Sequence, residues 1–248
     1  MVPLVFASNS PMTRRLSFSF FVFLAACKTE SSDGLATSAI KADYTVEVRD
    51  RADAPSDLKF QAFLYKDDSS TYVQLSDGDR VVGWTDAAPE TTMTRSITGY
   101  YADAMGVDRK SATFKLYRAD GSTSAGATVG IPPVPAFTTT SLSVPYAGGT
   151  GVFDLAWSNP VAAANVHVFV DPCNGISTTT LPTIPDTGSY KITTKDLTVG
   201  VPAADTCVKL TVWREVYGSQ APDPALRPES TVKAARIDEV RLTLQPGN

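Results

Sequence analysis

The sequence predicts an all-β protein: two tandem antiparallel β-sandwich domains that follow a lipoprotein signal peptide and a flexible tether. Short apolar stretches with a two-residue period recur from Tyr44 to the C-terminal end of the chain. Glycine, proline and aspartate separate these stretches, and no segment carries a sustained helical stripe. Regularly spaced short strands of this kind are typical of antiparallel sandwiches with an immunoglobulin-like (Ig-like) arrangement.

The N-terminal residues 1–26 predict a bacterial lipoprotein signal peptide. Arg14 and Arg15 are the only charged residues before Cys27, and an apolar run follows them over 16–24. This run is too short to span a bilayer about 30 Å thick. Leu24-Ala25-Ala26-Cys27 then places small residues before a cysteine, which is the pattern of a lipidation site. An ordinary secretory signal that happens to contain a cysteine is the alternative.

We therefore expect a lipid, including palmitate, on Cys27 and anchoring in the cell outer membrane, with the folded part facing the periplasm or the cell surface. Lys28 follows the cysteine, where an aspartate often signals retention in the inner membrane. Residues 27–43 are rich in serine, threonine, alanine and aspartate and show neither period, so they predict a flexible lipidated tether. The formal net charge of −4 and the absence of basic runs argue against nucleic acid as a partner.

The first β-sandwich domain is predicted over 44–132. Its strands are expected at 44–48, 58–64, 72–75, 80–84, 95–101, 112–118 and 127–131. Ser76-Asp77-Gly78-Asp79 predicts a hairpin between two of them, because Gly78 can adopt positive φ. Asp120-Gly121 predicts another tight turn. The prolines of 131–135 interrupt any strand ladder and mark the domain boundary.

The second β-sandwich domain is predicted over 133–248. Its strands are expected at 138–144, 152–157, 166–170, 189–193, 208–216 and 240–244. Immunoglobulin domains carry a tryptophan between their two cysteines. Here Trp157 precedes Cys173 and Trp213 follows Cys207, so the chain is Ig-like only in a loose sense.

Two cysteines remain once Cys27 is assigned to the lipid. Cys173 and Cys207 form an even pair, which predicts a disulfide in an oxidising compartment. A zinc site is the competing interpretation, but it needs two more ligands, and His167 is the chain's one histidine. We therefore expect a disulfide, no metal and no cofactor.

Several motifs of the second half resemble an uncharacterised family of exported bacterial proteins and lipoproteins. The motifs are Ile-Pro-Pro-Val-Pro-Ala-Phe-Thr at 131–138, Leu-Ala-Trp-Ser at 155–158, Pro-Asp-Thr-Gly-Ser-Tyr at 185–190, Thr-Cys-Val-Lys-Leu-Thr-Val at 206–212 and Asp-Pro-Ala-Leu at 223–226. The resemblance covers residues 131–245 and the first domain only in outline. It implies a β-sandwich fold, export and the cysteine pairing. It implies no catalytic residues.

Candidate catalytic and metal-binding residues are few. His167 lies in a predicted strand with no triad partner motif, so we interpret it as a strand residue. A calcium site would gather Asp67, Asp68, Asp77 and Asp79, although solvated turns explain these aspartates equally well.

An aromatic platform for sugar stacking is one interpretation of Tyr100, Tyr101 and Trp84. The other interpretation is that these side chains belong to the hydrophobic core. Aromatic residues on alternating strand positions are more often core.

The loop over 218–233 is the candidate binding surface, because loops of this length in compact β-domains are often functional. Its candidate binding residues are Pro222, Asp223, Pro224, Leu226 and Arg227. A proline-stiffened connection is the alternative.

The expected function is a non-catalytic binding module of the cell envelope, with an envelope protein or a glycan as its partner besides the membrane. A hydrolase acting on envelope polysaccharide and a structural spacer are the alternatives. An acidic pair in a cleft lined by aromatics would favour the hydrolase.

Overall fold

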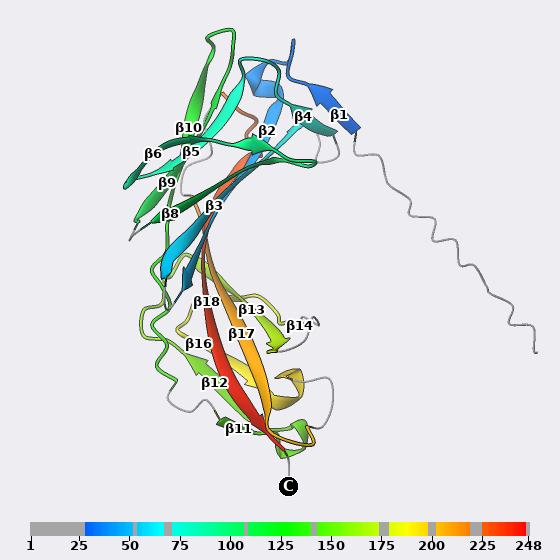
Figure 1. The fold of residues 1–248 in the computed structure, drawn as a ribbon, viewed down its shortest axis with the longest axis vertical. Coiled ribbons are helices and arrows are strands. Elements are labelled where there is room, and N and C mark those ends of the chain that lie inside the picture. The colour runs from blue at the N-terminus through cyan, green and yellow to red at the C-terminus, as the bar shows by residue number, and fades with distance from the viewer. Residues whose placement is uncertain are drawn as a thin grey trace, which may run out of the picture.

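The computed structural model describes residues 28–51, 54–66, 71–106, 109–139, 143–173, 179–197, 202–218 and 225–246. Over this part of the chain it contains eighteen strands, three short 3-10 helices and no α-helix (Figure 1). The prediction of an all-β protein is confirmed. Within the same residues, no helix is long and apolar enough to cross a membrane.

Strands from the N-terminal half enclose a first hydrophobic core. They are β1 (Lys28–Ser31), β2 (Ile40–Arg51), β3 (Ala54–Lys66), β4 (Thr71–Gln74), β5 (Arg80–Thr85), β6 (Ala88–Thr92), β7 (Thr94–Arg95), β8 (Tyr100–Gly106), β9 (Ser111–Tyr117) and β10 (Thr123–Gly130). A sheet with the order β10-β9-β5-β6 forms one layer, and the part of the large sheet around β3 and β2 forms the other. The 3-10 helix η1 (Thr37–Ala39) precedes β2.

Aromatic rings fill the centre of this first core. Tyr44 stacks on Phe114 with ring centroids 4.9 Å apart, and Phe60 meets Phe114 edge-on at 5.5 Å. All three side chains are buried because each stands at a core-facing position of its strand. Burying one such side chain contributes about 1.5–3 kcal/mol, so this alternation accounts for the stable packing of the two layers.

Strands from the C-terminal half enclose a second hydrophobic core. They are β11 (Ser143–Pro145), β12 (Val152–Ala156), β13 (Ala164–Pro172), β14 (Thr179–Thr180), β15 (Ile184–Pro185), β16 (Ser189–Thr193), β17 (Thr206–Tyr217) and β18 (Thr231–Gln245). The β12–β16 pair packs over β13, β17 and β18 through buried Leu155, Ile192, Val168, Leu210 and Leu242. Two 3-10 helices, η2 (Ala147–Gly149) and η3 (Thr194–Leu197), lie in this half.

The two longest C-terminal strands connect the two cores. β18 pairs with β17 along its length and with β2 in parallel, from Thr231 opposite Asp43 to Ile237 opposite Arg49. Its side chains at Val232 and Ala234 belong to the first core, whereas Val240, Leu242 and Leu244 belong to the second. Figure 1 shows β17 and β18 running from one half of the molecule into the other. The first core therefore includes the beginning of β18, a strand from the C-terminal half, and the division at 132/133 stays a prediction.

The predicted hairpin at Ser76-Asp77-Gly78-Asp79 is wrong. β4 and β5 flank this turn, but β4 belongs to the large sheet and β5 to the four-stranded sheet, so the chain crosses from one layer to the other. Gly78 does have a positive φ of 90°. A Cβ atom there would also lie 2.8 Å from the Cβ of Ala119, so close packing requires glycine.

The N-terminal segment differs from the predicted tether over 27–43. Cys27 lies outside the described residues, but β1 pairs in parallel with β4 and η1 leads into β2. Ser32 is fully buried, donates a hydrogen bond to Asp79 (2.6 Å) and accepts one from the backbone N–H of Ser76 (2.8 Å). Arg118 donates to the carbonyl of Ser32 and pairs with Asp79. These contacts with distant segments order a stretch whose own composition lacks a period.

A buried ion pair joins Asp186 and Arg214 in the second core. The Nε of Arg214 lies 2.8 Å from the Oδ2 of Asp186, and neither side chain is exposed. Asp186 also accepts hydrogen bonds from the indole of Trp157 (2.7 Å) and the backbone N–H of Val161 (2.8 Å). Arg214 donates to the carbonyl of Pro133. The carboxylate of Asp186 therefore connects the 157–161 segment with β17, and Arg214 extends the network to Pro133.

The predicted disulfide between Cys173 and Cys207 is confirmed. It connects the residue after β13 with the second residue of β17, where the Cα atoms are 5.4 Å apart. The backbone N–H of Cys173 also donates a hydrogen bond to the carbonyl of Cys207. The disulfide therefore closes one end of the β13–β17 pair.

Candidate functional site

The large sheet has an outer face that points away from both cores, and a groove of about 410 Å³ crosses it. We call this feature the sheet groove. Its lining combines aromatic, charged and small residues from β3, β2, β18 and β17: Lys41, Asp43, Thr45, Glu47, Gln61, Phe63, Tyr65, Trp213, Glu215, Tyr217, Thr231, Lys233 and Ala235.

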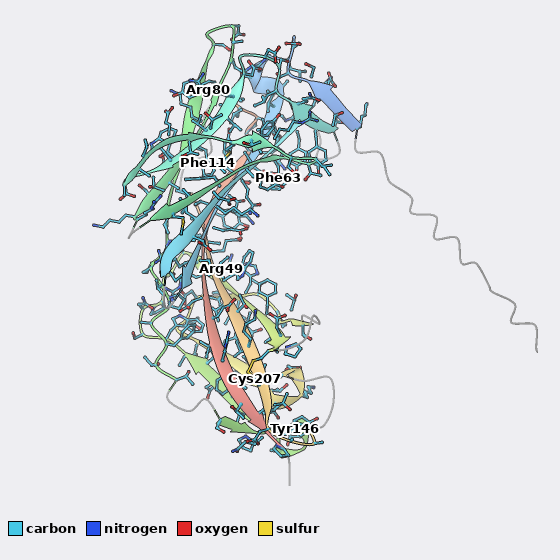
Figure 2. All side chains as sticks on the ribbon, viewed as in Figure 1. Arg49, Phe63, Arg80, Phe114, Tyr146 and Cys207 are labelled. Carbon is cyan, nitrogen blue, oxygen red and sulfur yellow. A yellow bond between two sulfur atoms is a disulfide. The ribbon has the colours of Figure 1, made fainter. Side chains whose placement is uncertain are left out.

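Strand alternation places these residues on one face. Each is at an odd-numbered position, whereas even-numbered neighbours such as Tyr44, Leu64 and Ala234 fill the first core. Figure 2 shows the result for β3, with Phe63 on the side away from Phe114. The groove is therefore built on a paired sheet with a packed core behind it, and such support fixes side-chain positions better than a loop does.

Aromatic side chains stand on both sides of the groove. Phe63 and Tyr65 come from β3, and Trp213 and Tyr217 come from β17, with two strands between them. Trp213 is held by Phe169 of β13, with ring centroids 5.4 Å apart. Tyr217 is 53% exposed, which leaves much of its ring accessible from the groove.

The pairing of β18 with its two neighbouring strands places the carboxylates of Glu47 and Glu215 on either side of Ala235, at the bottom of the groove. Ala235 of β18 is opposite Glu47 of β2 and opposite Glu215 of β17, so the three lie in one row. Ala235 is 1% exposed. Gln61 donates a hydrogen bond to Glu47 (2.7 Å), and Lys233 donates one to Glu215 (2.9 Å).

The charges on the β17 side of the groove stabilise one another. Burial opposes the negative charge of Glu215, but the hydrogen bond and positive charge of Lys233 outweigh it and lower the pKa of Glu215. Burial likewise opposes the charge of Lys233, and its contact with Glu215 nevertheless raises the pKa of Lys233. Burial and the neighbouring Glu215 raise the pKa of Tyr217. This corner therefore holds an ion pair beside a neutral phenol.

The charged residues of β2 next to β3 are paired as well. Lys41 lies 3.0 Å from Asp43, and Thr231 donates a hydrogen bond to the same carboxylate. Burial, Tyr72 and Asp43 raise the pKa of Tyr65 to about 12, so its hydroxyl stays protonated. Both aspartate oxygens therefore have partners inside the groove.

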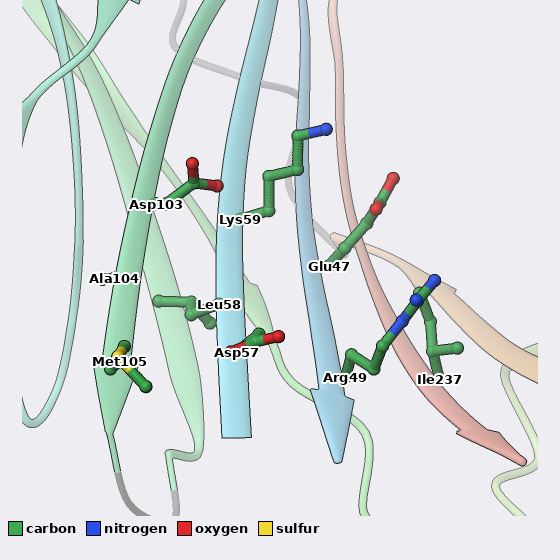
Figure 3. Close-up of a pocket in the computed structure, with 9 residues that line it drawn as sticks. All are labelled: Glu47, Arg49, Asp57, Leu58, Lys59, Asp103, Ala104, Met105 and Ile237. Carbon is green, nitrogen blue, oxygen red and sulfur yellow. The ribbon is translucent and has the colours of Figure 1, made fainter. Parts of the chain in front are cut away.

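A second depression of about 590 Å³ continues along the same face. It is lined by Glu47, Arg49, Asp57, Leu58, Lys59, Asp103, Ala104, Met105 and Ile237 (Figure 3). Lys59 lies between Asp103 on β8 and Glu47 on β2, as the strand register requires. Glu47 lines both depressions, so the polar face extends beyond the sheet groove.

The Glu215–Lys233 pair predicts a pH dependence of stability. Because folding lowers the pKa of Glu215, its stabilising effect is complete above the ordinary value of 4.5 and is lost as the pH falls through the lower folded-state value. Wild type should therefore lose more melting temperature than Glu215→Gln between about pH 5 and about pH 2. Glu90→Gln on exposed β6 is the matched control and should follow wild type. Parallel pH profiles for wild type and Glu215→Gln would contradict the assignment.

The structure places the predicted binding loop differently. Pro222, Asp223 and Pro224 lie outside the described residues. Leu226 is 4% exposed and packs in the first core, so it is unavailable as a docking residue. The backbone N–H of Arg227 donates to the carbonyl of Ile40, which fixes this part of the loop against β2. The last residues of the predicted loop belong to β18.

The three aromatic residues considered for a sugar platform do not share one surface. Tyr100 is buried, and its hydroxyl accepts a hydrogen bond from the backbone N–H of Leu75. Tyr101 is the next residue of β8 and therefore points to the outer face, where it meets Phe63 edge-on. Trp84 belongs to the other sheet. Consecutive positions on one strand cannot share a face, and that rule separates the two tyrosines.

The remaining candidates take structural roles. His167 is half-buried in β13, where its Nδ1 is 2.9 Å from Thr183 and its Nε2 is 3.8 Å from Glu215. Asp79 binds Ser32 and Arg118, whereas Asp67 and Asp68 lie outside the described residues. Among the residues that the structure describes, no group of three or more potential ligands is placed to hold a metal ion.

Sequence reasoning missed the groove residues of β17. Trp213, Glu215 and Tyr217 alternate with residues of the opposite face, and this pattern of aromatic and acidic side chains was available in the sequence. Their position across the groove from Phe63 and Tyr65 depends on the parallel β2–β18 pairing, which joins segments far apart in the chain.

No protein-family model and no curated protein sequence matches the chain, so the resemblance of residues 131–245 to exported bacterial proteins stays a prediction. The solved structures to which the chain is similar include a cytokine receptor complex, with 10% identity, a TM-score of 0.28, and coverage of 80% of this chain and 95% of that chain.

The FN1–FN3 domains of chicken CNTN1 match at 8% identity and a TM-score of 0.26, over 82% of this chain and 66% of that chain. A tetra-tandem repeat from the extending region of a large adhesion protein matches at 17% identity and a TM-score of 0.20, over 83% of this chain and half of that chain. All three TM-scores are 0.28 or lower, so the similarity of the chain to these solved structures is distant.

Proposed function

We propose that this chain is a lipid-anchored protein of the bacterial outer envelope that binds an envelope component in the sheet groove without chemical turnover. The observation that carries the proposal is the groove itself. Aromatic side chains stand on both sides of paired charged groups, on a sheet with a packed core behind it. Pockets with apolar walls and a few well-positioned polar groups are the usual form of a ligand site.

The signal-like sequence that ends at Cys27 supports the anchor. β1 begins at Lys28, directly after that cysteine, and pairs with β4. A lipid on Cys27 would therefore hold the β1–β4 edge close to the bilayer, without a flexible spacer between them.

A hydrolase acting on envelope polysaccharide is the second candidate, and one observation favours it. Glu47 and Glu215 flank Ala235 in an aromatic-lined groove, with backbones two strand spacings, or about 10 Å, apart. Inverting glycosidases hold two carboxyl groups at a comparable separation, and one of them has a raised pKa. The ion pair with Lys233 instead lowers the pKa of Glu215, which favours binding over general-acid catalysis.

Capture of envelope material by full-length protein tests this proposal. The protein is immobilised through a C-terminal tag and incubated with envelope extract in mild detergent. Wild type and Val152→Ala should retain material, and Trp213→Ala combined with Tyr217→Ala should retain much less. Val152 is the matched control because it is exposed and lies outside the groove. In the producing cells, labelled palmitate should enter wild type but not Cys27→Ala.

Equal retention by wild type and the groove variant would contradict the proposed binding surface. Palmitate incorporation into Cys27→Ala would contradict the anchor. Steady release of saccharide products by wild type, lost in Glu47→Gln or Glu215→Gln, would replace the binding function with the hydrolase.

A further inference from the structure

The sheet groove carries charged groups that already have partners within it. Lys41 pairs with Asp43, and Lys233 pairs with Glu215. Gln61 donates a hydrogen bond to Glu47. The lining holds three carboxylates and two ammonium groups, so it lacks the excess of cations that phosphate or another polyanion requires. The same groups still offer oxygen lone pairs and N–H donors to hydroxyl groups of a neutral ligand.

The aromatic side chains of the groove suit a ligand with flat C–H faces. Tyr217 is half exposed on one side of the groove, where Trp213 also stands, with Glu215 between them along β17. Phe63 and Tyr65 stand on the other side. The raised pKa values of Tyr65 and Tyr217 keep both phenols uncharged. A pyranose ring presents a C–H face that packs on an aromatic ring, while its rim carries hydroxyl groups that reach the neighbouring polar groups.

The dimensions of the groove exceed those of one sugar ring. β3 and β17 are separated by β2 and β18, so the two aromatic sides stand three strand spacings, or about 14 Å, apart. The volume of about 410 Å³ falls within the range of small-ligand sites. A ligand that touches both sides is therefore a chain of several rings.

A protein partner fits this groove less well. Protein interfaces have a contiguous apolar centre. Of the four exposed large apolar side chains among the described residues, Tyr217 lines the groove, and Ile97, Met105 and Val152 do not. The groove floor is instead occupied by charged and polar groups around Ala235.

We infer that the sheet groove is a binding site for an uncharged oligosaccharide chain, with Tyr217 and Trp213 as its stacking side chains. The inference rests on the proposed function, because it names the class of envelope component that the groove takes. The carboxylates and lysines of the groove bind the hydroxyl groups of this ligand and keep their internal pairs.

Isothermal titration of full-length protein in a detergent without a sugar headgroup tests the inference. The probes are chitohexaose, cellohexaose and maltohexaose, with polygalacturonate as the anionic control. At least one neutral hexasaccharide should bind. Tyr217→Ala should weaken that binding about tenfold, Tyr217→Phe should weaken it less because it keeps the ring, and Val152→Ala should leave it unchanged.

The inference is overturned if no neutral hexasaccharide binds, if polygalacturonate alone binds, or if Tyr217→Ala binds as wild type does. Envelope capture distinguishes this failure from failure of the proposed function. In one outcome, the eluted material depends on Tyr217 for retention, is degraded by protease after elution, and no hexasaccharide binds. The binding function then stands, and the oligosaccharide is excluded as the ligand. If capture does not depend on Tyr217, both the proposed binding function of the sheet groove and the oligosaccharide inference are contradicted.

Discussion

Asp186→Asn should lower the free energy of unfolding by about 3–5 kcal/mol, because it leaves the buried guanidinium of Arg214 without its counter-charge. Arg214 is fully buried, and burial already lowers its pKa, while Asp186 acts in the opposite direction. The loss is large compared with the usual stability of a domain, about 5–15 kcal/mol. Urea unfolding followed by circular dichroism measures it.

Two further variants make this prediction specific. Asp154→Asn alters an exposed aspartate of β12 in the same half of the protein and should change stability by less than about 0.5 kcal/mol. Trp157→Phe removes the indole N–H that donates to Asp186 and also shrinks a buried ring, so its cost should be intermediate, about 1–3 kcal/mol. The ion pair has no special role if Asp186→Asn and Asp154→Asn unfold at the same urea concentration.

Reduction of the Cys173–Cys207 disulfide should lower the free energy of unfolding by about 3–4 kcal/mol. The two cysteines are 34 residues apart, and in the chain-entropy model a closed loop of this length removes that much entropy from the unfolded state. Denaturant unfolding with and without a thiol reductant measures the change. The double variant Cys173→Ala, Cys207→Ala should match reduced wild type and show no response to reductant. Two titratable thiols in the oxidised, unfolded protein would refute the bridge.

Local alternation made most strands predictable. The apolar positions of β2, β3, β9 and β16 recur every second residue, and each faces a core. This signal is local and strong, because a shift by one residue would expose every apolar side chain. The disulfide was predictable because the predicted lipidation of Cys27 leaves two cysteines and one possible pairing.

Long-range contacts explain the errors. The turn from Ser76 to Asp79 has hairpin residues, but Ser32 and Arg118 bind it from distant segments and the strands on its two sides enter different sheets. β1 likewise forms through pairing with β4 and not through an apolar period of its own. A sequence window contains no information about such partners.

The sheet groove was beyond sequence reasoning for the same physical reason. The alternation of Trp213, Glu215 and Tyr217 marks a polar face of one strand. Only the parallel pairing of β18 with β2 places that face across the groove from Phe63 and Tyr65. The loop over 218–233, which the sequence predicts as a binding surface, instead buries Leu226 in the first core. An apolar residue in a loop can complete a core.

Photocrosslinking at Tyr217 in intact cells tests whether the sheet groove binds a glycan. A photoreactive phenylalanine replaces Tyr217 in one strain and Val152 in another; the two side chains are 53% and 61% exposed, so exposure is matched. After irradiation, we expect an adduct at 217 whose added mass glycosidase removes and which stays on the peptide after proteolysis, and no such adduct at 152. A glycan adduct at 152 with none at 217 would contradict the assignment of the sheet groove as the binding site.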